Sequence, residues 1–141
     1  MTPAQVTVIQ DSFAKVVPIS EQAAAMFYGR LFEIAPEVKP LFRGDMTEQG
    51  RKLMATLAVV VSGLGDLAAI LPAASALARR HVDFGVKPAH YAPVGAALLW
   101  TLERGLGPHW TPALADAWAA AYATLSDFMI AEAYGRPQAA E

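Results

Sequence analysis

His81 is the residue whose type and position most directly suggest chemistry in this sequence. It follows Ala74, Leu77 and Ala78 at helical spacing, so its imidazole would lie on the apolar side of a helix that ends near Gly85. An imidazole on an apolar face needs a polar partner or a metal ion, and no other side chain on that face provides a partner. Taken alone, His81 is therefore either a structural histidine or a metal ligand.

The remaining histidines, His90 and His109, do not form a chelating pattern with His81. A chelated ion such as zinc needs three or four protein ligands, whereas this sequence has three histidines and no cysteine. No His-x-x-x-His or Glu-x-x-His spacing is present. Haem requires only one axial histidine, because its macrocycle supplies the other ligands. With 55% hydrophobic and 17% charged residues, the chain could form both a core and a large apolar slot.

The elements that would position His81 are all helical. Alternation of apolar and polar residues at period two is weak, whereas prolines and capping residues divide the sequence into helical stretches. We expect six to eight helices in one all-α domain over residues 1–141, with a frayed tail at 135–141. The expected stretches begin near residues 3, 20, 36, 47, 72, 88 and 112, with a possible short helix after residue 66. Pro72 would then begin the helix that carries His81.

Charge and hydropathy exclude several classes of protein. Eleven basic and thirteen acidic side chains give a net charge of −2, which is unsuited to binding nucleic acid or an anionic membrane. The N-terminus lacks the features of a signal peptide, and the apolar run 57–61 is too short to span a bilayer. The absence of cysteine fits a reducing compartment, so we expect a cytoplasmic protein.

Six short motifs follow one another along the chain: Phe27-Tyr28, PEVKPLF at 36–42, Glu48-Gln49, Arg80-His81, Gly85-Val86 and HYAPVG at 90–95. In their order and spacing they resemble the single-domain bacterial globins of the flavohaemoglobin type. The resemblance extends from about residue 4 to residue 134. It implies a globin fold packed around a haem pocket, with haem b as the cofactor.

The resemblance also assigns roles to individual residues. It implies that His81 is the proximal iron ligand, that Phe42 packs against the haem plane, and that Tyr28 and Gln49 donate hydrogen bonds to dioxygen at the iron. Neutral donors favour such a ligand without bringing a net charge into the pocket. Tyr28 as a direct ligand of ferric iron remains an alternative. Further implied cofactor contacts are Lys52, Leu53, Leu77, Arg80, Val86, Tyr91 and Val94, although Lys52 and Arg80 are equally expected to be solvated rather than paired with propionates.

One feature departs from the family pattern. Tyr91 matches the proximal tyrosine that, in the family, works with a glutamate on the last helix to hydrogen-bond the proximal imidazole. That glutamate aligns with Ala133, and Glu132 lies one residue earlier, about 100° away around a helix. Either the last helix is shifted, so that Tyr91 and Glu132 form the relay, or the relay is absent. Without this relay, His81 would donate to the backbone carbonyl of Leu77. The acceptor matters because it determines how strongly His81 donates electron density to the iron.

The implied function is reversible binding of dioxygen, used in nitric oxide detoxification. Nitric oxide, carbon monoxide and cyanide are further expected ligands. The sequence has no Gly-rich dinucleotide motif and ends where a flavohaemoglobin would continue, so an external reductase is expected to supply electrons, and enzymatic activity stays open. The alternatives are a non-enzymatic dioxygen storage or delivery protein, a haem-based gas sensor, and a haem-free helical domain, which His81, Phe42, Tyr28 and Gln49 together disfavour.

Overall fold

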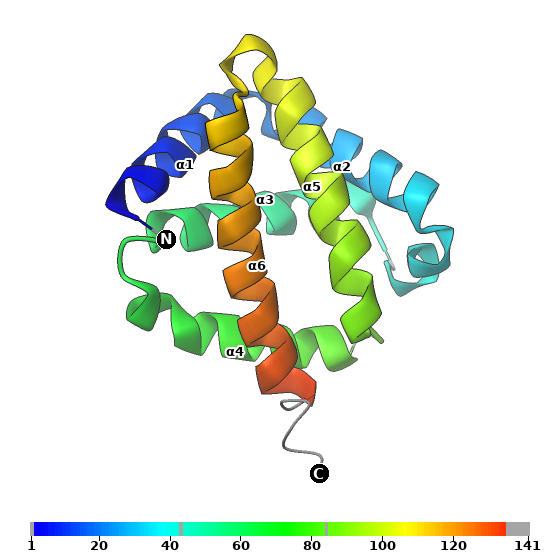
Figure 1. Cartoon of the computed structure of the whole chain (residues 1–141). Helices are drawn as coiled ribbons and strands as arrows, with labels where there is room; N and C mark the ends of the chain where they lie inside the picture. Colours follow the sequence, from blue (N-terminus) through cyan, green and yellow to red (C-terminus); the bar gives the residue numbers. More distant parts are fainter. Residues whose placement is uncertain (1, 43, 84, 135–141) are drawn as a thin grey trace.

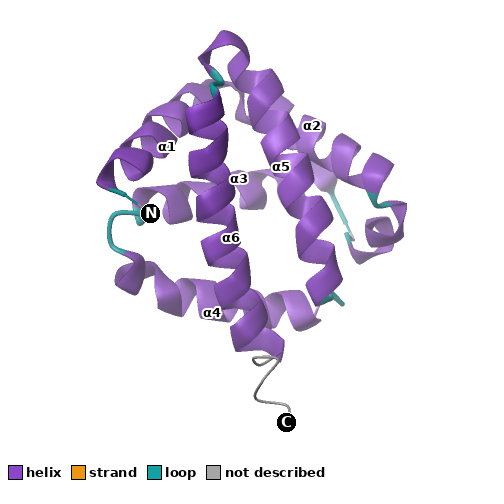
Figure 2. Cartoon of the chain, viewed as in Figure 1, coloured by secondary structure: helices purple, strands orange, loops and turns teal. Residues whose placement is uncertain are grey.

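The computed structural model describes residues 2–42, 44–83 and 85–134. Within these ranges the chain forms six α-helices and four short 3-10 helices, with no strand, as Figures 1 and 2 show. The α-helices are α1 (Pro3–Val16), α2 (Ser20–Ile34), α3 (Met46–Ser62), α4 (Leu67–Asp83), α5 (Tyr91–Leu106) and α6 (Pro112–Tyr134). The 3-10 helices are η1 (Val17–Ile19), η2 (Pro36–Leu41), η3 (Pro88–His90) and η4 (Gly107–His109). The prediction of an all-α chain is confirmed, and the predicted frayed tail at 135–141 lies outside the described residues.

The predicted start of the helix that carries His81 is wrong. This helix, α4, begins at Leu67, so Pro72 lies inside it and the short helix expected after residue 66 is its first turn. Pro72 cannot donate to the carbonyl of Ala68, but both residues are exposed, so water can solvate that carbonyl. Ile70 is buried, and its side chain lies so close to Gly63 that a Cβ there would come within 2.0 Å of it. This tertiary contact favours a helix that starts before the proline.

The buried residues divide into two clusters. The larger one is formed mainly by α1, α2, α5 and α6, with Leu31 of α2 and Trp118 of α6 among its buried members. The smaller one consists of Ala74, Ala78, Tyr91 and Met129, and it joins α4 to α6 and to the start of α5. In Figure 1, α4 lies below α3 and is crossed by α6, its main packing partner. The helix that carries His81 therefore lies at the border of the larger core.

The helices of the described chain are of ordinary length for a globular core. None of them, within residues 2–42, 44–83 and 85–134, has the length and apolar character needed to cross a membrane. The longest, α6, has 23 residues and contributes to both buried clusters through one continuous helix. It thereby connects the large core to the end of α4, where His81 lies.

Candidate functional site

His81 lies in the last turn of α4, and its ring is half-buried. Its Nδ1 atom is 2.8 Å from the backbone carbonyl oxygen of Leu77, one turn earlier. Because a carbonyl can only accept, Nδ1 carries the proton and Nε2 keeps a lone pair for a metal ion. Burial lowers the pKa of His81, and the charge on Arg80 lowers it further, although the Leu77 carbonyl acts in the opposite direction. The imidazole is thus held neutral and in one orientation.

The backbone just after His81 is fixed by a helix-terminating motif. Val86 N–H donates to the His81 carbonyl and Gly85 N–H donates to the Val82 carbonyl, both at 2.9 Å. Gly85 has a φ of +92°, which is the left-handed conformation that this Schellman geometry requires. A Cβ at Gly85 would also come within 3.2 Å of Leu41 Cδ2, so the end of η2 lies beside this turn.

Tyr91 packs against His81 from the first residue of α5. The two rings are stacked, with centroids 6.2 Å apart and an angle of 23° between their planes. The Tyr91 hydroxyl is buried and has no hydrogen-bond partner among the described residues. Burial raises the pKa of Tyr91 to about 12, and the nearby Tyr134 contributes to this rise. Tyr91 therefore contacts the imidazole through its ring, while its hydroxyl has no acceptor.

The two candidate relay positions on α6 have different surroundings. Glu132 is exposed, and its Oε1 accepts a hydrogen bond from Ser75 Oγ at 2.8 Å. Ala133 packs against the cluster that contains Tyr91, but a methyl group cannot accept a proton. Of the three acceptors that the sequence left open for His81, the structure has the Leu77 carbonyl in place, while Glu132 binds Ser75 of α4.

A second group of predicted site residues surrounds Tyr28 of α2, which is buried among aromatic rings. Its ring meets the rings of Phe27 and Phe42 edge to face, with centroid distances of 5.0 Å and 5.2 Å, and it stacks on Phe32 with a centroid distance of 6.0 Å. The Tyr28 hydroxyl donates to the backbone carbonyl of Gln49, at a long distance of 3.3 Å. Burial raises the pKa of Tyr28 to about 12, so its phenol is neutral at physiological pH. The structure thus brings Tyr28, Gln49 and Phe42 together.

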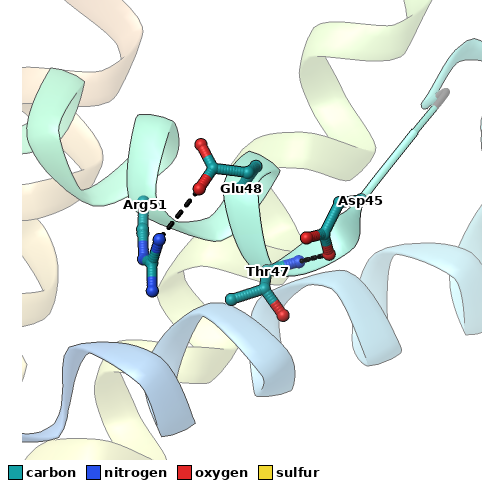
Figure 3. A network of polar contacts seen from close by, with 4 residues as sticks. All are labelled: Asp45, Thr47, Glu48 and Arg51. Atoms are coloured by element: carbon teal, nitrogen blue, oxygen red, sulfur yellow. Dashed lines mark hydrogen bonds and ion pairs between the residues drawn. The ribbon is translucent and has the colours of Figure 1, made fainter.

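Gln49 is half-buried in the first turn of α3, which is held by polar contacts shown in Figure 3. The Asp45 side chain caps the helix by accepting from Thr47 N–H at 2.9 Å, and the Gln49 N–H donates to the Asp45 carbonyl at 3.1 Å. Glu48 and Arg51 form an exposed ion pair at 2.8 Å. These contacts fix the turn that presents the Gln49 carbonyl to Tyr28.

The other predicted cofactor contacts divide between the two clusters. Phe42, Leu53 and Val94 pack against the larger one, and Leu77 and Val86 against the smaller one. All five are only half-buried although they are apolar. The two groups adjoin at the start of α5, where Tyr91 belongs to one cluster and Val94, one turn later, to the other. Lys52 and Arg80 are exposed. Their side chains are therefore in contact with solvent, which was one of the two alternatives expected for them.

These observations test whether haem fits the site. Among the described residues, no three His, Cys, Asp or Glu side chains are grouped where they could hold an ion by themselves. His81 offers one neutral nitrogen, and half-buried apolar side chains of both clusters are available to enclose a flat apolar group. The buried Tyr91 hydroxyl shows that polar atoms near His81 are still unsatisfied. The residues present therefore fit haem.

Two positioning residues were not found by sequence reasoning. Tyr122 of α6 donates its hydroxyl to the Tyr91 carbonyl at 2.6 Å. Gly95 makes this possible, because a Cβ at that position would come within 2.5 Å of the Tyr122 ring. Gly95 belongs to the motif at 90–95, but nothing in the local sequence indicates that Tyr122, 27 residues away, packs on it.

Comparisons with known proteins show which family the chain resembles. The family model described as Globin matches residues 25–129. A flavohemoprotein of Bordetella parapertussis is 37% identical over 107 residues, which is 74% of this chain and 27% of that protein. A flavohemoprotein of Rhodopirellula baltica is 30% identical over 128 residues, covering 89% of this chain and 31% of its own length. The chain thus spans less than a third of these curated relatives.

A solved structure matches the whole fold. The structure of a bacterial globin from Campylobacter jejuni has a TM-score of 0.81 to this chain, with 27% sequence identity. The match covers 99% of this chain and 100% of the other. This chain and the Campylobacter jejuni globin therefore share the same arrangement of helices.

Proposed function

The chain belongs to the globin family and is a haem globin, and we propose that it binds dioxygen reversibly and uses it to detoxify nitric oxide. The observation that carries this proposal is the placement of a neutral hydrogen-bond donor, the Tyr28 hydroxyl, beside Phe42 and the start of α3. A pocket with one imidazole ligand and one neutral donor is suited to a diatomic ligand that gains partial negative charge.

The cofactor would be haem b, held without covalent attachment. The sequence contains no cysteine, so thioether bonds to the haem vinyl groups cannot form. His81 would bind the iron through Nε2, while Leu77 holds Nδ1. Contacts with the macrocycle would come from Phe42, Leu53, Leu77, Val86, Tyr91 and Val94, and the exposed Lys52 and Arg80 would be available to the propionates.

When bound, the haem iron supplies the reversible site for dioxygen and the redox centre at which nitric oxide is converted to nitrate. Tyr28 would donate its single proton to the distal ligand and release the Gln49 carbonyl. That exchange costs little, because the existing hydrogen bond is long at 3.3 Å. The Gln49 side chain would act as a second donor.

Conversion of one nitric oxide and one dioxygen to nitrate consumes one electron. The sequence carries no Gly-rich dinucleotide motif, so we propose that a reductase outside this globin domain supplies that electron. Carbon monoxide and cyanide would compete for the same distal position.

A dioxygen storage or delivery role is the second candidate. It is favoured by the Leu77 carbonyl, because a neutral acceptor leaves His81 a modest electron donor. The two functions differ in turnover: only a detoxifying globin should consume nitric oxide repeatedly when a reductase and dioxygen are supplied.

The test combines two measurements on Tyr28→Phe. Loss of a hydrogen bond to a partly charged ligand should speed dioxygen release roughly ten-fold or more, and nitric oxide consumption should fall with it. Haem content, measured from the Soret band, serves as the internal control and should stay at one per chain. An unchanged release rate at full haem content would contradict the assigned role of Tyr28.

A further inference from the structure

Two arginines stack on one tryptophan at the surface where α2 packs on α5. The guanidinium carbon of Arg30 on α2 is 5.2 Å from the centroid of the Trp100 ring, and that of Arg104 on α5 is 4.5 Å from it. Trp100 is half-buried and Arg104 is exposed, so the stack reaches the solvent. Because a stacked guanidinium keeps few orientations, it loses little further freedom when it forms an ion pair.

A hollow adjoins the stack at the C-terminal end of α5. Its volume is about 440 Å³, and it is lined by Glu103, Arg104, Gly107 and Trp110. The stack, the hollow and a neighbouring carboxylate of α2 form a surface that we call the α2–α5 patch: Arg30, Glu33, Trp100, Glu103, Arg104 and Trp110. It holds two of the three tryptophans of the chain. Tryptophan and arginine are enriched at the energetic centres of protein interfaces, so the patch indicates a protein partner.

The charged residues of the patch are of both signs. On α2, Arg30 forms an ion pair with Glu33, one turn later. On α5, Glu103 and Arg104 are adjacent in sequence and exposed. Neither of them forms an ion pair within residues 2–42, 44–83 and 85–134. Glu103 and Arg104 therefore keep one negative and one positive charge available to a partner.

This pair of opposite charges limits the kind of partner. An acidic surface would be repelled by Glu103, and a basic surface would be repelled by Arg104. A second copy of the chain, related by a two-fold axis, meets neither problem. Each Glu103 then faces the Arg104 of the other copy, so the same ion pair forms twice and no like charges meet.

We propose that the α2–α5 patch is the interface of a homodimer, in which Glu103 and Arg104 form reciprocal ion pairs across a two-fold axis. Burial of Trp100 and Trp110 supplies most of the affinity, and the ion pairs fix the register of the two copies. The interface lies far from the candidate haem site. Arg104 follows Tyr91 by 13 residues, about 20 Å along the helix, and in Figure 1 the end of α5 lies at the top while α4 lies at the bottom. The proposal therefore does not depend on the haem function.

The experiment measures the dissociation constant of the dimer by sedimentation equilibrium of the full chain, at concentrations up to about 1 mM. Arg104→Glu should raise this constant roughly ten-fold or more, because carboxylates of the two copies then lie opposite one another. Glu103→Arg should have the same effect through opposed arginines. Arg79→Glu is the matched control, since Arg79 is exposed on α4, outside the patch, and its reversal changes the net charge by the same amount as Arg104→Glu. It should leave the constant unchanged.

Two further measurements separate an interface from a general effect on folding. The double variant Glu103→Arg/Arg104→Glu exchanges the two charges and should restore the dimer, because the reciprocal pairs form again. An equimolar mixture of the two single variants should form a heterodimer, since one presents two carboxylates at these positions and the other presents two guanidinium groups. Circular dichroism of each variant checks that the helices are retained.

Three results would overturn the proposal. The first is a chain that remains monomeric at about 1 mM, which would leave the patch to another partner. The second is a dimer whose dissociation constant is the same in Arg104→Glu and Glu103→Arg as in the unmodified protein. The third is a mixture of these two variants that stays monomeric although both are folded.

Discussion

The Tyr122 hydroxyl donates to the Tyr91 carbonyl at 2.6 Å, which ties the middle of α6 to the first residue of α5. The contact is possible because Gly95 leaves room for the Tyr122 ring on the surface of α5. Through it, a residue outside the site fixes the backbone of the tyrosine that stacks on His81. The surroundings of the His81 imidazole thus depend on packing between two helices that do not carry it.

Gly95→Ala should destabilise the protein. The added Cβ would come within 2.5 Å of the Tyr122 ring, and such overpacking typically costs about 1–3 kcal/mol. Urea denaturation measures the change in the free energy of unfolding. Gly29→Ala is the matched control, because nothing lies within 4 Å of a Cβ there and alanine favours the helix by about 1 kcal/mol. Equal effects of the two substitutions would contradict the packing argument.

His81→Ala should abolish stable retention of haem, since the structure offers no second imidazole in that turn of α4. Absorption spectra after reconstitution with haem, followed by gel filtration, measure retention. His109→Ala is the control, because His109 is exposed in η4 and should leave the Soret band unchanged. Normal retention in His81→Ala would refute the assignment of the proximal ligand.

Gly85→Ala should loosen the end of α4. An L-residue in the left-handed conformation costs about 1–2 kcal/mol, and the new Cβ would also press on Leu41. We expect lower stability and faster haem loss, measured by thermal denaturation and by transfer of haem to an acceptor protein. Gly65→Ala, where a Cβ meets nothing within 4 Å, should show neither effect.

Stability should decrease at alkaline pH because of the buried tyrosines. The pKa of Tyr28 is raised from 10.0 to about 12, so the folded protein keeps a proton that the unfolded chain releases. The stabilisation from this group is complete below pH 10 and is lost as the pH rises through about 12. The decline in the free energy of unfolding should therefore be shallower in Tyr28→Phe. Tyr134→Phe, which removes a more exposed phenol, should change the slope less. Equal slopes for all three proteins would contradict the stabilising role assigned to the buried Tyr28 phenol.

Much of the helical pattern could be predicted from local signals. Thr2 and Gln5 form the predicted capping box, and α1 begins directly after Thr2. Gly85 ends α4 where the sequence indicated an exit. Such signals act over one or two turns, so a single sequence is enough to identify them. The prediction that a helix begins at Pro72 is wrong, because burial of Ile70 against Gly63 outweighs the local preference of proline for a helix start.

The candidate site was predicted only in part. Tyr28, Gln49 and Phe42 lie together, as the resemblance implied. The sequence could not show that the Tyr28 hydroxyl donates to the backbone of Gln49, because the two residues are 21 positions apart and meet through the packing of α2 on α3.

The sequence by itself determined that the chain is helical and that His81 lies at the end of an apolar helix face. It also limited the acceptor of His81 to three candidates, one of them the Leu77 carbonyl, which helix geometry places one turn away. Only the tertiary structure decided how the neighbouring groups are used. Glu132 meets Ser75, 57 residues away, and Ala133 instead packs on the Tyr91 cluster. Glu132 and Ala133 are neighbours on α6, yet they face different surroundings. Which surroundings each one faces depends on how α6 crosses α4, and no local sequence pattern specifies that crossing.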